Sequence, residues 1–189
     1  MAPSFVHLHL HSEFSLTDST LRIAPLVQRC AQLRLPAVAV TDTSNLFALV
    51  KFFKAAEGAG VKPIAGADLY LAEDNQPPAR VTVLCLDRSG FLSLSRLITR
   101  AFLDGHRGEL VALRPEWLLA DCAGLVLIVG RESPVGQLLA AGKRESAHAL
   151  LLEWSRLLPG RLYVELARTQ RAGEESFNSV AIELADELG

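Results

Sequence analysis

Short apolar runs alternate with helical patterns along most of the chain. The apolar runs predict strands at residues 5–10, 37–40, 64–71, 81–86, 125–129 and 163–166. Between them, apolar residues recur at intervals of three and four positions and predict amphipathic helices at about 23–33, 46–56, 89–102, 147–158 and 177–188. This alternation predicts an α/β fold in which parallel strands are joined by right-handed crossovers, as a barrel or as an open sheet.

The helical spacing also predicts which side chains are buried. The buried face of the second helix is expected to consist of Leu46, Val50, Phe53 and Ala56. Trp117 and Trp154 stand in helical stripes and are expected to be anchors in the core or at its edge. No strand follows the last helix, so we expect the domain to continue beyond Gly189.

Polar segments between these elements suggest loops. Residues 73–79 (EDNQPPA) predict a polar loop, and residues 104–109 (DGHRGE) are the best candidate for an exposed recognition loop. Asp42 follows the strand at 37–40. Its carboxylate is expected either to orient the loop after that strand or to cap a backbone N–H group.

Composition narrows the classes of function. Half of the 189 residues are apolar, so residues 1–189 can form one domain with a sizeable core. The formal charge of -2 gives no basic surface, so we expect little direct DNA binding. The longest apolar run, 125–129, is too short for a membrane span. Cys30, Cys85 and Cys122 lack zinc-ligand spacing and suggest reduced thiols in a cytoplasmic protein.

The sharpest local signal is a run of alternating histidines at residues 6–11. Side chains alternate across a strand, so His7, His9 and His11 are expected on one face. Imidazoles two positions apart can converge on one cation, and Glu13 or Asp18 could add a carboxylate ligand. A polar strand face whose histidines form hydrogen bonds or meet solvent is the alternative.

Three segments carry a resemblance to the PHP domain of bacterial DNA polymerase III alpha subunits: FVHLHLHSEFSLTDS, PAVAVTDTSNLFALVKFFKAAEGAGVKPIAGADLYLA and LYVELARTQRAGEESFN. The similarity runs over almost the whole chain. It implies a distorted PHP-type β/α barrel, incomplete at the C-terminus, with metal ligands at the C-terminal ends of the strands. Members with an intact site bind a cluster of divalent ions, and some hydrolyse phosphoesters.

The resemblance implies that only part of this metal site remains. The retained ligand positions are His9, His11, Asp18 and Asp68, the last standing where glutamate is usual. Ligand positions of the family are replaced at Thr43, Arg80, Arg131 and Thr169. We therefore expect no catalytic residue in this segment and no firmly bound cofactor, with a residual zinc, manganese or magnesium ion at most.

An arginine cannot ligate a cation, and it repels one within its reach. Our hypothesis is that Arg80, together with Arg131, pairs with Asp18 or Asp68 and replaces the charge of a metal. The alternative is that both arginines are solvated surface residues.

Three functions stay open. The favoured one is a non-catalytic module of a replicative polymerase, a scaffold and docking surface for the proofreading exonuclease subunit and the rest of the replicase. Its parent would be a DNA-directed DNA polymerase, a nucleotidyltransferase of DNA replication. The second is a metal-dependent phosphoesterase or pyrophosphatase with a residual site. The third is an anion pocket without turnover, in which Arg80 and Arg131 hold phosphate among His9 and His11.

Overall fold

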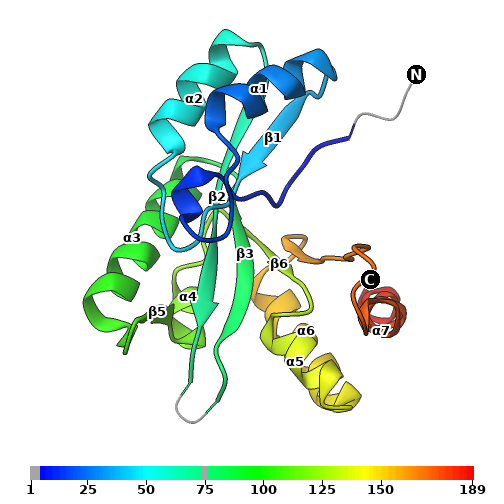
Figure 1. Ribbon diagram of the computed structural model, residues 1–189. Coiled ribbons are helices and arrows are strands. Elements are labelled where there is room, and N and C mark those ends of the chain that lie inside the picture. The colour runs from blue at the N-terminus through cyan, green and yellow to red at the C-terminus, as the bar shows by residue number, and fades with distance from the viewer. Residues whose placement is uncertain (1–4, 74–75) are drawn as a thin grey trace.

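The computed structural model describes residues 5–73 and 76–189 (Figure 1). Along the chain its elements are the 3-10 turn η1 (Glu13–Ser15), α1 (Ile23–Gln32), β1 (Ala37–Val40), α2 (Leu49–Gly58), β2 (Lys62–Leu71), β3 (Ala79–Cys85), α3 (Arg88–Asp104), β4 (His106–Arg107), β5 (Leu110–Leu113), α4 (Pro115–Ala120), β6 (Leu125–Val129), α5 (Pro134–Ala140), α6 (Arg144–Leu157), β7 (Leu162–Val164) and α7 (Glu174–Leu188). The predicted α/β class is confirmed. Two residues of the loop expected at 73–79 lie outside the described residues.

The seven strands form one open, mixed sheet. Its order is β4-β5-β2-β3-β6-β7, and β1 pairs with the first half of β2. The β1–β2, β2–β5 and β6–β7 pairs are parallel, whereas β2–β3, β3–β6 and β4–β5 are antiparallel. The expectation of parallel strands is therefore confirmed for three of these pairs and was wrong for the other three. The connection between β2 and β3 is too short for a crossover helix, so these strands pair as a hairpin.

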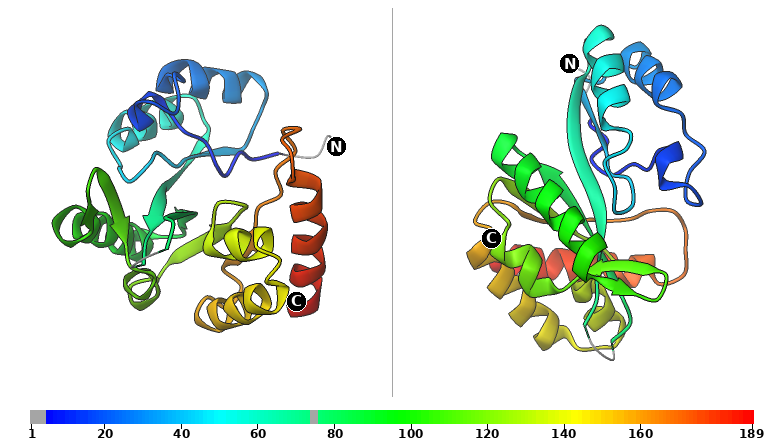
Figure 2. Two further views of the ribbon diagram at one scale, coloured as in Figure 1. Left: turned by 60° about the horizontal axis from the view of Figure 1, so that its bottom comes forward. Right: turned by 90° about the vertical axis from the view of Figure 1, so that its left-hand side faces the viewer.

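Helices cover one face of the sheet in two groups. Figure 2 shows α1, α2 and the N-terminal segment on one side of the molecule and α5–α7 on the other, with strands between them. The larger core forms where β2, β3 and β6 pack against α3 and α6, and it includes Leu69, Leu127 and the fully buried Trp154. A smaller core joins β1 to α1 and α2 around Val38 and Phe52.

The opposite face of the sheet, here called the inner face, holds the candidate site residues Asp68 and Arg80. Because side chains alternate along a strand, residues between the core positions of β2, β3 and β6 point to this face. The strand register places Thr82 beside both Asp68 and Ile128, and Leu84 beside Val126. A small cluster of Ala39, Leu84 and Ile128, with Ile64 and Val126 against it, makes one end of the inner face apolar. The end around Asp68 and Thr82 is polar.

Residues 5–10 do not form the predicted strand. His7 makes an isolated parallel bridge to Val38, and the carbonyl groups of His7 and Leu10 accept hydrogen bonds from Ala39 and Thr41. This segment is extended along β1, and no named strand flanks it on its other side within the described residues. Because the segment forms hydrogen bonds with β1 on one side and with no described strand on the other, it does not form a continuous strand.

The buried face predicted for α2 was wrong in part. Phe52 and Ala56 are buried, whereas Val50 is 69% exposed and Phe53 is 50% exposed. The helix begins at Leu49, because Asn45 accepts a hydrogen bond from the Phe47 N–H group and holds a turn before it. Apolar residues on more than one side of this helix left its orientation undetermined in the sequence.

Other expectations can be compared directly. Trp154 lies in the core, and Trp117 lies at its edge with the Arg100 guanidinium 4.0 Å from its ring centre, as predicted. The candidate recognition loop at 104–109 instead contributes to the β4–β5 hairpin. Within residues 5–73 and 76–189, no helix combines the length and the apolar character that a membrane span requires.

Gly66 of β2 lies opposite Leu84 of β3, where the two strands approach closely. A Cβ atom at this position would lie 2.5 Å from the Val83 carbonyl oxygen. We therefore expect Gly66→Ala to lower the free energy of unfolding by about 1–3 kcal/mol, measured by urea denaturation. The control is Gly58→Ala, where the added Cβ meets nothing within 4 Å. An equal loss of stability in both variants would contradict the close approach.

Candidate functional site

Asp42 fixes the N-terminal segment against the end of β1. Its buried carboxylate accepts hydrogen bonds from the Ser12 N–H group at 2.6 Å, from Ser12 Oγ at 2.7 Å and from Ser15 Oγ at 2.7 Å. Ser15 Oγ in turn accepts from the Thr43 N–H group. Asp42 therefore accepts from a backbone N–H group, one of its two expected roles, and through Ser15 it also reaches the loop after β1. The anchored loop holds the segment that carries the two candidate histidine ligands.

Asp68 lies at the centre of the polar end of the inner face. Its carboxylate is completely buried on β2, and its Oδ1 atom accepts a hydrogen bond from Thr82 Oγ1 at 2.6 Å. The Oδ2 atom lies 2.9 Å from His11 Nε2 and 3.0 Å from His9 Nε2. Burial alone would raise the pKa of Asp68, but the hydrogen bonds from His11, His9 and Thr82 hold this pKa well below its ordinary value.

His9 lies between two carboxylates. Its Nε2 atom faces Asp68, and its Nδ1 atom is 2.6 Å from Glu165 Oε1. A carboxylate oxygen can only accept, so both ring nitrogens must carry a proton. Burial lowers the pKa of His9, but the hydrogen bonds and charges of Asp68 and Glu165 outweigh it and raise the pKa to about 10. The imidazolium is therefore the stable form at neutral pH.

Arg80 brings a second cation to the same group. This residue of β3 places Nε 3.5 Å from Asp68 Oδ2 and Nη1 3.6 Å from Asp18 Oδ2. Its Nη2 atom is 2.8 Å from Glu132 Oε2, in the segment after β6. Asp18 Oδ2 also lies 3.1 Å from His11 Nδ1. One guanidinium thus contacts three carboxylates from three separate parts of the chain.

Arg131 is not brought to this group. Its Nη1 atom donates a hydrogen bond to the Ala172 carbonyl oxygen at 2.7 Å, beside the first turn of α7. Thr169 is also used locally, because its N–H and hydroxyl groups both donate to the Glu174 carboxylate. Of the two arginines in the hypothesis, only Arg80 meets Asp18 and Asp68 within the described chain. Arg131 instead satisfies a carbonyl group where the chain turns into α7.

Glu132 and Glu165 belong to the site but were not predicted as site residues. Each is a carboxylate shortly after a strand, since β6 ends at Val129 and β7 ends at Val164. This position after a strand is a signal that the sequence does carry. The sequence alone does not show that both residues lie at the same end of the inner face as His9 and Arg80.

Three side chains offer ligand atoms that one metal ion could share. His9, His11 and Asp68 each offer one, and these atoms all lie within 4.8 Å of one another. The residues do not fit a multinuclear cluster, because Thr43, Arg80 and Thr169 supply neither imidazole nor carboxylate. The Thr43 Oγ1 atom is buried and has no hydrogen-bond partner in the described residues. The Arg80 guanidinium opposes even one ion by its charge.

A cavity of about 580 Å³ opens beside these residues. Its charged lining residues are His9, Arg80, Arg131, Glu132, Glu165, Arg171 and Glu174. Four of these residues are cations and three are anions, but Arg80 already contacts three carboxylates and His9 two. These engaged cations give the cavity no strong preference for a further anion.

Comparison with known proteins gives the family. The family model described as "PHP domain" matches residues 7–169. The chain belongs to the PHP domain family. A DNA polymerase III subunit alpha from Xylella fastidiosa is 48% identical over 96% of this chain. Its counterparts from Pseudomonas fluorescens and Escherichia coli K12 are 42% and 38% identical over 100% and 99% of the chain. The chain spans about 16% of the length of these relatives.

Solved structures agree on the PHP fold. A Chromobacterium violaceum amidohydrolase with bound sulfate and no metal matches with a TM-score of 0.64 and 14% identity, over 96% of this chain and 83% of that protein. A Bifidobacterium adolescentis protein described as a metal-dependent phosphoesterase matches with a TM-score of 0.56 and 12% identity, over 95% and 83%. This PHP domain keeps the expected barrel-like fold, and its sheet is not closed.

The raised pKa of His9 predicts a pH-dependent stability. In the native chain the raised pKa keeps the proton on His9 up to about pH 10, whereas the unfolded chain releases it near the ordinary histidine pKa of 6.5. The native state then binds more protons than the unfolded state. The contribution of His9 protonation to the free energy of unfolding is complete below pH 6.5 and is lost as the pH rises to about 10. The free energy of unfolding, measured with EDTA present, should therefore decline across this range.

The matched variants are His9→Gln, which should remove this part of the decline, and His148→Gln on α6, which should retain it. An identical pH profile for His9→Gln and the unmodified chain would contradict the assignment.

Proposed function

We propose that this chain is the N-terminal PHP domain of a replicative DNA polymerase III alpha subunit, a cytoplasmic DNA-directed DNA polymerase. Within the longer polypeptide it acts as a non-catalytic scaffold for the polymerase core. It also serves as a docking surface for the proofreading exonuclease subunit. Nucleotidyl transfer is performed by residues outside this segment.

Similarity to DNA polymerase III alpha subunits supports the proposed identity of the longer polypeptide. The relatives named above are all DNA polymerase III alpha subunits, and they match almost the whole chain. A formal charge of -2 favours a protein partner over the phosphate backbone of DNA. A replicase component that contributes contacts and no chemistry is consistent with both observations.

The contacts of Arg80 are the observation that carries the non-catalytic role. Hydrolysis by a metal site needs an ion that activates water and binds the phosphate. Here a guanidinium lies 3.5 Å from the carboxylate oxygen that both candidate histidines share. We propose that Arg80 replaces the charge of a metal and ties Asp18, Asp68 and Glu132 together, with a structural role.

A direct test is a binding and activity assay on one preparation. The polypeptide carrying this segment should retain the proofreading exonuclease subunit in a pull-down, whereas an unrelated exonuclease should not be retained. With manganese it should not hydrolyse p-nitrophenyl phosphate. Loss of exonuclease binding on deletion of residues 1–189 would support the docking role. Retention of full binding after that deletion would contradict it.

A residual phosphoesterase is the second candidate, and the grouping of His9, His11 and Asp68 favours it. These residues would hold one ion, which when bound would supply Lewis-acid polarisation of a phosphate ester. Manganese-dependent hydrolysis that His9→Ala abolishes would support this activity and would overturn the non-catalytic role. The third candidate, an anion pocket, is disfavoured because Arg80 and His9, which line the 580 Å³ cavity, already contact carboxylates.

Arg80→Met tests the charge replacement. Removing the guanidinium takes a shared cation away from three carboxylates, so we expect a loss of about 1.5–3 kcal/mol in the free energy of unfolding. Zinc should then raise the melting temperature of Arg80→Met more than that of the unmodified chain. Arg131→Met is the control, because Arg131 contacts a backbone carbonyl away from this group. An equal zinc response in all three proteins would refute the role of Arg80.

A further inference from the structure

Helix α3 leaves its outward side uncovered. Figures 1 and 2 place this helix at the outer edge of the molecule, with no described helix beyond it. Its buried residues, which include Leu94, Leu97 and Ala101, pack on the sheet. The opposite side, here called the α3 outer face, is formed by Phe91, Leu92, Ser95, Thr99, Phe102 and Leu103.

The α3 outer face is apolar along most of its length. Its four large apolar side chains are exposed, and Leu103 is the most open of them at 76%. The two hydroxyl groups turn back to the helix backbone. Ser95 Oγ donates to the Phe91 carbonyl oxygen, and Thr99 Oγ1 donates to the Ser95 carbonyl oxygen, both at 2.8 Å. A contiguous apolar surface of this kind is typical of a contact site.

Charged side chains border the α3 outer face without crossing it. Arg96 donates hydrogen bonds to the two carboxylate oxygens of Asp121, at 2.6 and 2.8 Å. The Arg100 guanidinium lies over the ring of Trp117. Both arginines are thus held against α4 and the residue that follows it. A partner therefore meets apolar and neutral groups along the middle of the face.

The order of large and small side chains along the face is symmetric about Leu97. Two large residues precede it at 91 and 92, and two follow it at 102 and 103. The small residues Ser95 and Thr99 lie between these pairs, each two positions from Leu97. When two such helices pack antiparallel about a two-fold axis, large side chains meet large ones. The small side chains meet at the centre, where the helices can approach closely.

The flanks of the face also match. Phe91 and Phe102 lie on one flank and Leu92 and Leu103 on the other, because successive helical residues turn by about 100°. A two-fold axis that exchanges two antiparallel helices brings each flank onto the same flank of the copy. Phe91 then meets Phe102 of the copy, and Leu92 meets Leu103. The α3 outer face is therefore complementary to itself.

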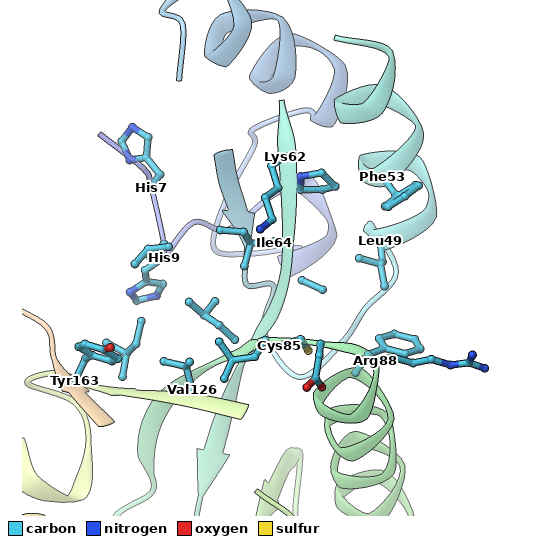
Figure 3. Close-up of a pocket in the computed structure, with 18 of the residues that line it drawn as sticks. His7, His9, Leu49, Phe53, Lys62, Ile64, Cys85, Arg88, Val126 and Tyr163 are labelled. Carbon is cyan, nitrogen blue, oxygen red and sulfur yellow. The ribbon is translucent and has the colours of Figure 1, made fainter. Parts of the chain in front are cut away.

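The two ends of α3 carry opposite charges. Arg88 is its first residue and Asp104 its last, and neither has an ion-pair partner in the described parts of the chain. Asp87, which precedes Arg88, is engaged as the N-cap. Figure 3 shows the Arg88 side chain extending away from the cavity of about 1160 Å³ that it borders. In an antiparallel pair, Arg88 lies beside the helix end that carries Asp104 of the copy, where the helix dipole also favours a cation.

We propose that the α3 outer face is a self-association surface, on which a second copy of this chain packs through its own α3, antiparallel and about a two-fold axis. One helix pair is small beside the about 1,200–2,000 Å² that stable interfaces bury, so the dimer forms at micromolar concentrations or above. The inference goes beyond the proposed function and does not depend on it, because none of the candidate site residues lies on α3.

The test is sedimentation velocity on the polypeptide that carries this segment, at concentrations from about 1 to 100 μM. The average sedimentation coefficient should rise with concentration toward that of a dimer. Leu103→Lys should raise the dissociation constant at least about 10-fold, because the substitution acts on both copies. Ile182→Lys, at an exposed apolar residue of α7, is the matched control and should leave the association unchanged.

Charge exchange tests the antiparallel arrangement. Arg88→Asp and Asp104→Arg each place like charges at both ends of the helix pair, and each should raise the dissociation constant about 3-fold. The double variant exchanges the two charges and should restore the original value.

Three results would overturn the proposal. A sedimentation coefficient that stays at the monomer value up to about 100 μM would mean that no second copy binds. Association that Leu103→Lys leaves intact would place the contact on another surface. A double variant that associates as weakly as its single variants would exclude the antiparallel pair.

Discussion

The buried carboxylate of Asp68 is the constraint on which the rest of the site depends. A charge without exposure to solvent must be met by hydrogen bonds and opposite charges, or it destabilises the fold. Asp68 receives contacts from His9, His11, Thr82 and Arg80, which come from the N-terminal segment and from β3. The contacts that stabilise the Asp68 carboxylate therefore also join the N-terminal segment to the sheet.

The same contacts of Asp68 limit metal binding at the site. An imidazole that faces carboxylates with both nitrogens has no lone pair left for a metal, so an ion would have to displace protons from His9. A guanidinium beside the shared oxygen adds a fixed positive charge. The polar end of the inner face thus resembles an internal salt bridge more than an open catalytic centre. That character agrees with the structural role proposed for Arg80 and this domain.

Much of this arrangement was predictable from local patterns. Strand and helix periods located most elements, and the HxH run together with Asp18, Asp68 and Arg80 marked residues that the fold does bring together. Antiparallel pairing of β2 and β3, the burial of Phe52 and the roles of Glu132 and Glu165 were not predictable in this way. Each depends on contacts between distant parts of the chain, and apolar residues on several sides of α2 fit more than one orientation. Arg131 shows the same limit, because proximity to a strand end did not determine where its side chain turns.

The most direct measurement of the central claim is a crystal structure obtained with added zinc or manganese, with anomalous scattering used to locate ions. The account predicts no ordered ion between His9, His11 and Asp68, and an Arg80 guanidinium still in contact with Asp68. A fully occupied ion at these three residues, with Arg80 displaced, would contradict it.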